Sequence, residues 1–99
     1  MFMVISYDIH HDRRRARLAI LLENYGQRVQ YSVFECILTL TQLAELRRRM
    51  LRVISLREDS VRFYFLPAAA LGEIRVLGQG QVTVDPPVYV PQSGVASGK

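Results

Sequence analysis

The sequence has little cysteine and no long apolar run, and both shortages narrow its class. Its single cysteine, Cys36, excludes an intramolecular disulfide framework and a cysteine-based zinc site, and it is typical of a reducing compartment. The longest uninterrupted apolar run, Phe63 to Leu71, has nine residues and contains a proline, whereas a membrane helix needs about 18 or more. The apolar start, Met1–Tyr7, lacks the basic leader of a secretory signal. We therefore expect a cytoplasmic protein with no membrane partner.

What is present fits one small folded domain. The chain has 99 residues, of which 49% are hydrophobic and 22% are charged, and this composition excludes an extended disordered chain. We find no internal repeat and no second domain. We expect a single domain over residues 1–90, followed by a flexible tail over residues 91–99 that contains serines and glycines.

Lysine is scarce too, and the basic residues are nearly all arginine. Lys99 is the only lysine among 13 basic residues, against nine acidic residues and a net charge of +4. A GC-rich genome explains this ratio as well as function does, but the arginines also cluster within residues 12–17 and 47–57. Two basic clusters suggest a nucleic-acid partner, although a solvated helix face is the alternative for the second. The candidate nucleic-acid contacts are Arg13, Arg14, Arg47 and Arg48.

Apolar periodicity predicts a strand, a helix and two further strands in the first part of the chain. Residues 1–7 are typical of a central strand, and a helix over residues 13–25 is expected, with Asp12 as its N-cap and Gly26 as its C′ residue. The buried parity then changes within residues 27–40, which a strand cannot do without a bulge or a turn. We predict strands over 27–31 and 33–39, hinged near Ser32, with one bulged strand as the alternative.

The second part predicts a helix and a strand, followed by short extended segments. Thr39, or alternatively Thr41, caps a helix that continues to about residue 55. Alternating apolar residues predict a strand over Ser60–Leu66, which Pro67 ends. Short strands are expected over residues 73–77 and 81–84, with extended chain through Val90.

The resulting order, βαββαβ with extra C-terminal strands, predicts an α+β fold: a ferredoxin-like two-layer sandwich with both helices on one face of an antiparallel sheet. The other face then has no cover from its own chain. Tyr64 and Phe34 are expected there, and a second copy of the sheet is the simplest way to bury them. We therefore predict a sheet-on-sheet homodimer.

Asp8 is the sharpest candidate for chemistry, because it is a carboxylate at the end of an otherwise apolar strand. The structural alternative is a strand-end aspartate that caps a turn. As a functional residue it would be a ligand for Mg²⁺, which is usually held by one or two carboxylates together with waters and phosphate oxygens. One aspartate is a poor site, but a residue near a two-fold axis meets its own copy, and two Asp8 carboxylates would make a plausible one.

Other polar residues carry weaker signals. His10 and His11 are adjacent and therefore point apart, with no third ligand at a useful spacing, which favours solvent-facing loop residues. Cys36 shares its parity with Phe34 and Leu38 and is expected to be a packed core thiol without a base. Ser32 has no evident general base either.

Several stretches resemble one protein family. They are Tyr7-Asp8 at the end of the first strand, the arginine-rich first helix, the run from Tyr25 to Glu35 (YGQRVQYSVFE), Glu58 to Arg62 (EDSVR) and Val76-Leu77-Gly78. Together they are similar to CRISPR-associated protein two, over roughly residues 1–90. The family is prokaryotic and ferredoxin-like, and its dimer packs sheet on sheet, with C-terminal strands reaching the partner's sheet.

The resemblance also implies an activity. Several family members are Mg²⁺-dependent endonucleases that cut single-stranded RNA or double-stranded DNA, and the aspartate matching Asp8 from each protomer binds the metal. The other positions that match residues linked to activity are Tyr7, Arg15, Arg17, Arg28, Ser32 and Phe34. The loop His10-His11-Asp12 departs from many relatives, and its imidazoles would favour Mn²⁺. Family members also bridge two dimers of the CRISPR integrase during spacer acquisition.

Two hypotheses stay open at this point. In a nuclease, Arg15, Arg17 and Arg28 would hold flanking phosphates while Tyr7 or Phe34 stacks on or positions a nucleotide. In a non-catalytic scaffold, the chain would bind duplex DNA and the integrase without cutting, and Asp8 would matter little. A small-molecule-binding regulatory domain is a third possibility, against which the arginine clusters argue.

Overall fold

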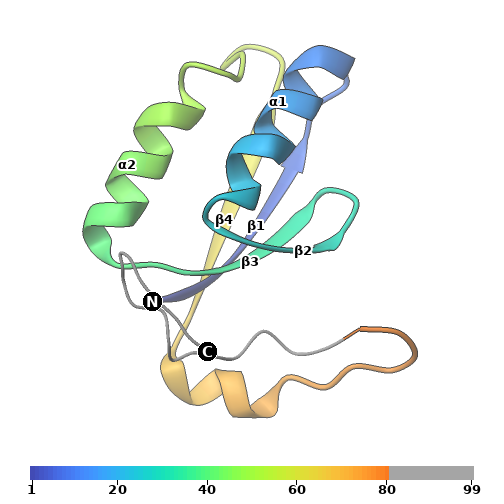
Figure 1. Cartoon of the computed structure of the whole chain (residues 1–99), viewed down its shortest axis with the longest axis vertical. Helices are drawn as coiled ribbons and strands as arrows, with labels where there is room; N and C mark the ends of the chain where they lie inside the picture. The colour runs from blue at the N-terminus through green and yellow to red at the C-terminus, as the bar shows by residue number, and fades with distance from the viewer. Residues whose placement is uncertain (81–99) are drawn as a thin grey trace.

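The computed structural model describes residues 1–80, which form two helices on one face of a four-stranded sheet (Figure 1). The elements are β1 (Phe2–Asp8), α1 (Asp12–Glu23), β2 (Gly26–Gln30), β3 (Val33–Ile37), α2 (Leu40–Met50), β4 (Ser60–Leu66) and the 3₁₀ helix η1 (Ala68–Glu73). The strands run in the order β2-β3-β1-β4, and every neighbouring pair is antiparallel. This is the predicted ferredoxin-like arrangement. No helix in residues 1–80 is long and apolar enough to cross a membrane.

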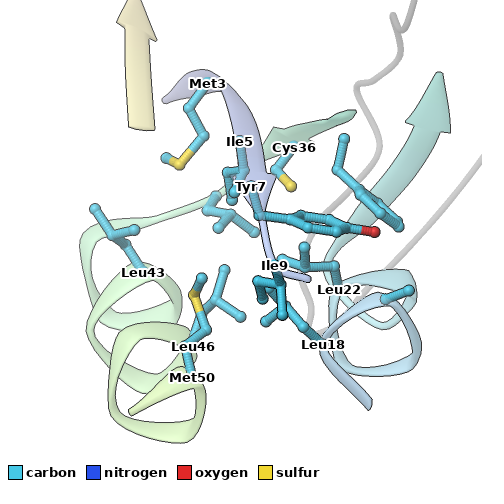
Figure 2. Packing of buried hydrophobic residues seen from close by; sticks show 13 residues of the cluster. Met3, Ile5, Tyr7, Ile9, Leu18, Leu22, Cys36, Leu43, Leu46 and Met50 are labelled. Atoms are coloured by element: carbon cyan, nitrogen blue, oxygen red, sulfur yellow. The ribbon is translucent and has the colours of Figure 1, made fainter. Parts of the chain in front are cut away.

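The core lies between the sheet and the helices. Figure 2 shows side chains of β1 and β3 pointing toward side chains of both helices: Met3, Ile5, Tyr7 and Cys36 on one side, and Leu18, Leu22, Leu43, Leu46 and Met50 on the other. Alternate residues of a strand face opposite sides of the sheet. The other parity of β1, which includes Val4, Ser6 and Asp8, therefore lies on the face that the helices leave uncovered.

The change of parity after residue 26 is a hairpin, and the single bulged strand is excluded. β2 and β3 pair antiparallel through a turn at Tyr31 and Ser32, with an irregular register between Arg28 and Gln30. The buried parity of β3 faces the helices, so Phe34 has no exposed surface. Our placement of Phe34 on the uncovered face is therefore wrong. Tyr64 does lie on that face, because it pairs with Val4, and it is 47% exposed.

Helix α1 begins and ends differently from the prediction. His11 is its N-cap, where Nδ1 accepts a hydrogen bond from the Arg14 amide at 3.2 Å, and Asp12 is the first helical residue. The C-cap is Asn24, so Gly26 is not the C′ residue. Gly26 instead begins β2, where a Cβ atom would lie only 2.4 Å from Cys36 Sγ and from the Glu35 carbonyl oxygen. A glycine is required there by close packing.

Helix α2 has the predicted capping box. The Thr39 hydroxyl accepts from the Gln42 amide at 3.1 Å, and the Gln42 side chain accepts from the Thr39 amide at 2.8 Å. The helix ends at Met50, earlier than predicted, but Val53 and Ile54 still pack against the core from the turns that follow.

The predicted strand over residues 73–77 is wrong. Residues Ala68–Glu73 form the 3₁₀ helix, and Ile74 is extended but joins no sheet within the described part of the chain. A strand needs a neighbour for its backbone hydrogen bonds, and residues 1–80 offer none here. The second short strand and the tail, at residues 81–84 and 91–99, lie outside the described residues, as does the extended chain to Val90.

Candidate nucleic-acid interface and metal half-site

Asp8 lies where β1 leaves the sheet, as predicted. It pairs with Ser60 of β4, and its side chain is 74% exposed. Among the described residues its only neighbour at ion-pair distance is the His10 imidazole, whose Nε2 lies 3.4 Å from Oδ1 of Asp8. The carboxylate therefore has no guanidinium partner within residues 1–80.

The donor set at Asp8 fits half of a Mg²⁺ site. A carboxylate oxygen is the hard ligand that Mg²⁺ prefers, and an exposed one leaves room for waters and phosphate oxygens. No group of three or more His, Cys, Asp or Glu side chains lies close enough to hold a metal within residues 1–80. One chain alone thus supplies Asp8 and the neighbouring imidazole, which is too few ligands for tight binding.

Arg15 ties the loop after Asp8 to the hairpin turn. Its Nη1 donates to the carbonyl oxygens of Ile9 at 3.0 Å and His10 at 3.4 Å, and its Nη2 donates to Asp12 at 2.6 Å. Its Nε donates to the Tyr31 hydroxyl at 3.1 Å. The pKa of Arg15 is raised, first by the hydrogen bond to Asp12. All three nitrogens are engaged, so Arg15 shapes the loop, and its predicted part as a free phosphate contact is not supported.

Tyr7 and Phe34 lie in the core and not at the surface. Tyr7 is 4% exposed and Phe34 is 0% exposed, with their ring centroids 6.4 Å apart. Figure 2 shows the Tyr7 ring in the layer between β1 and the helices. Neither ring is exposed for stacking on a nucleotide in this arrangement, and a part of either in positioning one stays a prediction. The Tyr7 hydroxyl donates to the Tyr31 carbonyl at 3.2 Å and so fixes the hairpin turn.

Arg28 lies over these rings from the edge strand β2. Its Cζ is 5.3 Å from the Phe34 centroid, and its Nη2 is 3.4 Å from the Tyr7 hydroxyl. The residue is exposed and has no carboxylate partner within residues 1–80. Cation–π contact fixes the guanidinium without neutralising it, so Arg28 keeps donors for a phosphate.

The two remaining predicted residues differ in exposure. Arg17 is exposed on α1 and makes no hydrogen bond or ion pair within residues 1–80. Ser32 is half-buried in the hairpin turn, where its carbonyl oxygen accepts from the Tyr7 amide at 3.1 Å. The sheet thus separates the predicted site residues: Asp8 lies on the uncovered face, and Tyr7 and Phe34 lie on the helix face.

The two basic clusters come together in space. Helices α1 and α2 run antiparallel, so the start of α1 and the end of α2 lie at the same end of the helix layer, where β1 also ends (Figure 1). Arg13, Arg47 and Arg48 are exposed there. Two clusters that are far apart in the sequence therefore lie at one end of the molecule, the basic end, where β1 also ends at Asp8.

Arg14, a predicted nucleic-acid contact, has its guanidinium bound by two carboxylates. Its Nε and Nη2 donate to the two carboxylate oxygens of Asp59 at 2.8 and 3.1 Å, and Nη2 also donates to Glu58 at 3.1 Å. The Asp59 side chain is 1% exposed and also accepts from the Ser55 amide at 2.7 Å. The Arg14 hydrogen bond lowers the pKa of Asp59. Arg14 therefore holds the loop before β4 against α1.

Asp59 and Tyr31 were not singled out from the sequence, whereas the prediction for the Cys36 thiol is confirmed. The sequence carried no signal for the partner of Asp59, whereas the parity of Tyr31, opposite to that of Phe34, indicated an exposed ring. Cys36 is buried, and its burial raises the pKa of the thiol to about 12. It is a packed core thiol.

Comparison with known proteins decides the family. The family model described as CRISPR associated protein Cas2 matches residues 1–74. The chain belongs to the Cas2 family. A relative from Synechocystis sp. named CRISPR-associated endoribonuclease Cas2 3 is 48% identical over 87 residues, which cover 87% of this chain and 95% of the relative.

Solved Cas2 structures share the fold. The crystal structure of Streptococcus pyogenes Cas2 at pH 6.5 has a TM-score of 0.71 and 34% identity, covering 79% of this chain and 100% of that chain. A chain in a partial Cas6-RT-Cas1–Cas2 complex has a TM-score of 0.70 and 31% identity, covering 90% and 96%. The resemblance to CRISPR-associated protein two is therefore confirmed.

Proposed function

We propose that this Cas2 family member is a metal-dependent endonuclease that works as a two-fold homodimer, in which Asp8 from each copy binds one Mg²⁺. The observation that carries the proposal is Asp8 itself, an exposed carboxylate without a guanidinium at the basic end of the molecule. The name of the Synechocystis relative, an endoribonuclease, points the same way.

A second copy supplies what one chain lacks. The helices cover only one face of the sheet, and the other face presents Tyr64 beside half-buried Val4. Packing two such faces together buries apolar surface and brings equivalent residues toward a two-fold axis. Two Asp8 carboxylates then complete the donor pair that Mg²⁺ needs.

The chain's own residues would bind and orient the nucleic acid. When bound, Mg²⁺ supplies Lewis acidity, which lowers the pKa of coordinated water and offsets negative charge on the scissile phosphate. Arg17 and Arg28 keep donors for flanking phosphates, and Arg15 holds the loop that follows Asp8. Mn²⁺ is expected to replace Mg²⁺, because His10 lies beside the carboxylate and an imidazole suits the softer ion.

The test compares Asp8→Asn with Glu23→Gln, which removes an exposed carboxylate at the far end of α1. Cleavage of RNA and of duplex DNA is measured with Mg²⁺, with Mn²⁺ and with a chelator. We expect metal-dependent cutting by the wild type and by Glu23→Gln, and loss of cutting in Asp8→Asn. Metal-dependent cutting that survives in Asp8→Asn removes Asp8 from the mechanism.

A scaffold function is the second candidate, and one observation favours it. A Cas2 chain similar to this one was solved in a complex with Cas6-RT-Cas1. A basic end built from Arg13, Arg47 and Arg48, with Arg17 farther along α1, suits duplex DNA bound without cutting, in a complex with the CRISPR integrase during spacer acquisition. Charge reversal of Arg47 and Arg48 together would then abolish duplex binding, whereas Asp8→Asn would leave it unchanged.

A further inference from the structure

Tyr31 is an exposed aromatic ring at the end of the sheet where Asp8 lies. It occupies the turn between β2 and β3 and is 70% exposed. The same turn is joined to the strand of Asp8, because the Tyr7 amide donates to the Ser32 carbonyl at 3.1 Å. Tyr7 and Phe34 are buried, so among these three rings Tyr31 is the one that a nucleotide can reach from this end.

The ring is flanked by two cations. The Cζ atoms of Arg15 and Arg28 each lie 5.9 Å from its centroid. The Tyr31 hydroxyl accepts from Arg15 Nε at 3.1 Å, and its carbonyl accepts from the Tyr7 hydroxyl at 3.2 Å. An exposed ring held at both its hydroxyl and its backbone loses little conformational freedom on binding.

The two arginines beside the ring, Arg15 and Arg28, have different roles. Arg15 is committed to the loop after Asp8, whereas Arg28 keeps donors that face solvent. An aromatic plane beside an uncommitted guanidinium is the pairing that binds a base and its adjoining phosphate together. The exposed Phe65 is a useful contrast, since no guanidinium stacks over it within residues 1–80.

We infer that Tyr31 stacks on an unpaired base while Arg28 binds the adjoining phosphate. The inference rests on the proposed function, because it names the part of the nucleic acid that the Asp8 end binds. The required ligand is a single strand, since the faces of a base inside a duplex are covered by its neighbours. The duplex itself would contact the exposed arginines on the helices.

The first experiment measures binding without cleavage. Fluorescence anisotropy with a chelator present compares a short labelled single strand, as RNA and as DNA, with the same strand annealed to its complement. Tyr31→Leu is expected to bind the single strand about tenfold more weakly, and Tyr31→Phe and the control Phe65→Leu are expected to bind it within about twofold of the wild type. All three are expected to bind the duplex like the wild type.

A second experiment detects the stacking itself. The chain has no tryptophan, so Tyr31→Trp introduces a single indole whose emission reports its surroundings. We expect a single strand to quench that emission strongly and the duplex to quench it weakly.

Several outcomes overturn the inference. Equal losses in Tyr31→Phe and Tyr31→Leu would show that the hydroxyl acts by positioning the loop. Equal losses on duplex and single strand, no loss in Tyr31→Leu, or unquenched indole emission would each exclude stacking. The proposed function fails in a different experiment, if metal-dependent cleavage survives in Asp8→Asn. Base binding is measured with a chelator present, so its result does not depend on cleavage.

Discussion

Asp8 and Asp59 lie almost side by side and are treated in opposite ways by the fold. Asp8 pairs with Ser60 across β1 and β4, so Asp59 is one residue away from that pair. The Asp59 side chain is 1% exposed and accepts two hydrogen bonds from Arg14. The Asp8 side chain is 74% exposed, and its only neighbour at ion-pair distance within residues 1–80 is the His10 imidazole.

The difference separates a carboxylate used for folding from one left for a ligand. A buried carboxylate must be paired, because an unpaired charge costs far more free energy when it is buried than when it is exposed to water. The Arg14 guanidinium on α1 therefore neutralises Asp59. Asp8 has no guanidinium partner within residues 1–80 and lies beside a basic surface, where an added cation can be shared between the carboxylate and a phosphate.

The largest expected effect is that substitution of Asp8 lowers activity, whereas substitution of Asp59 lowers stability. We expect Asp8→Asn to lower cleavage at least about 100-fold and to change the free energy of unfolding by less than about 0.5 kcal/mol. Asp59→Asn should lower the free energy of unfolding and retain cleavage below the melting temperature of the variant. Initial cleavage rates and urea unfolding check both variants. If Asp8→Asn unfolds more easily than Asp59→Asn, Asp8 is a structural residue.

The next largest effect is the loss in the free energy of unfolding when the Asp59 carboxylate is removed. Asp59→Ala leaves the Arg14 guanidinium and the Ser55 amide without their acceptor. We expect the free energy of unfolding to fall by about 2–3 kcal/mol. Urea unfolding with Glu23→Gln as the control measures it. A loss no larger than that of Glu23→Gln would mean that solvent replaces the ion pair at no cost.

Acid should weaken the stabilisation that the Asp59 carboxylate gives to the fold. The pKa of Asp59 in the folded chain lies below its ordinary value of 3.8, first because of the Arg14 hydrogen bond. A lowered pKa stabilises the fold fully above the ordinary pKa, and this stabilisation is lost as pH falls through the folded pKa. The difference in unfolding free energy between wild type and Asp59→Asn should therefore narrow below about pH 4. A constant difference from neutral pH down to acid would contradict this assignment.

Local signals in the sequence predicted much of the fold. The change of parity after Gly26 predicted the hairpin, Thr39 and Gln42 predicted the capping box, and β4 has the predicted bounds Ser60–Leu66. Each depends on residues a few positions apart. Asp8 was likewise found from its place after an apolar run.

What could not be predicted depends on distant contacts. Parity puts Phe34, Cys36 and Leu38 on one face but does not say which face the helices cover. The partner of Asp59 is 45 residues away in the sequence, and any of several arginines on α1 could have filled that place. The incorrect strand over residues 73–77 had suitable residues but no neighbouring strand within the described chain.

The smallest effect uses neighbouring arginines on α1 to test the same distinction among the cations. Arg13 is exposed, whereas Arg14 is bound to Asp59. If the basic end binds phosphates, Arg13→Gln removes one contact and should lower the slope of log affinity against log salt by about 0.9 for duplex DNA. Arg14→Gln removes no free cation, so it should leave that slope unchanged while it lowers the melting temperature. Duplex binding across a salt series, measured below the melting temperature of each variant, checks this. An equal change of slope in both variants would mean that Arg14 leaves Asp59 to contact the phosphate backbone, and the division between structural and ligand-binding charges at this end would then fail.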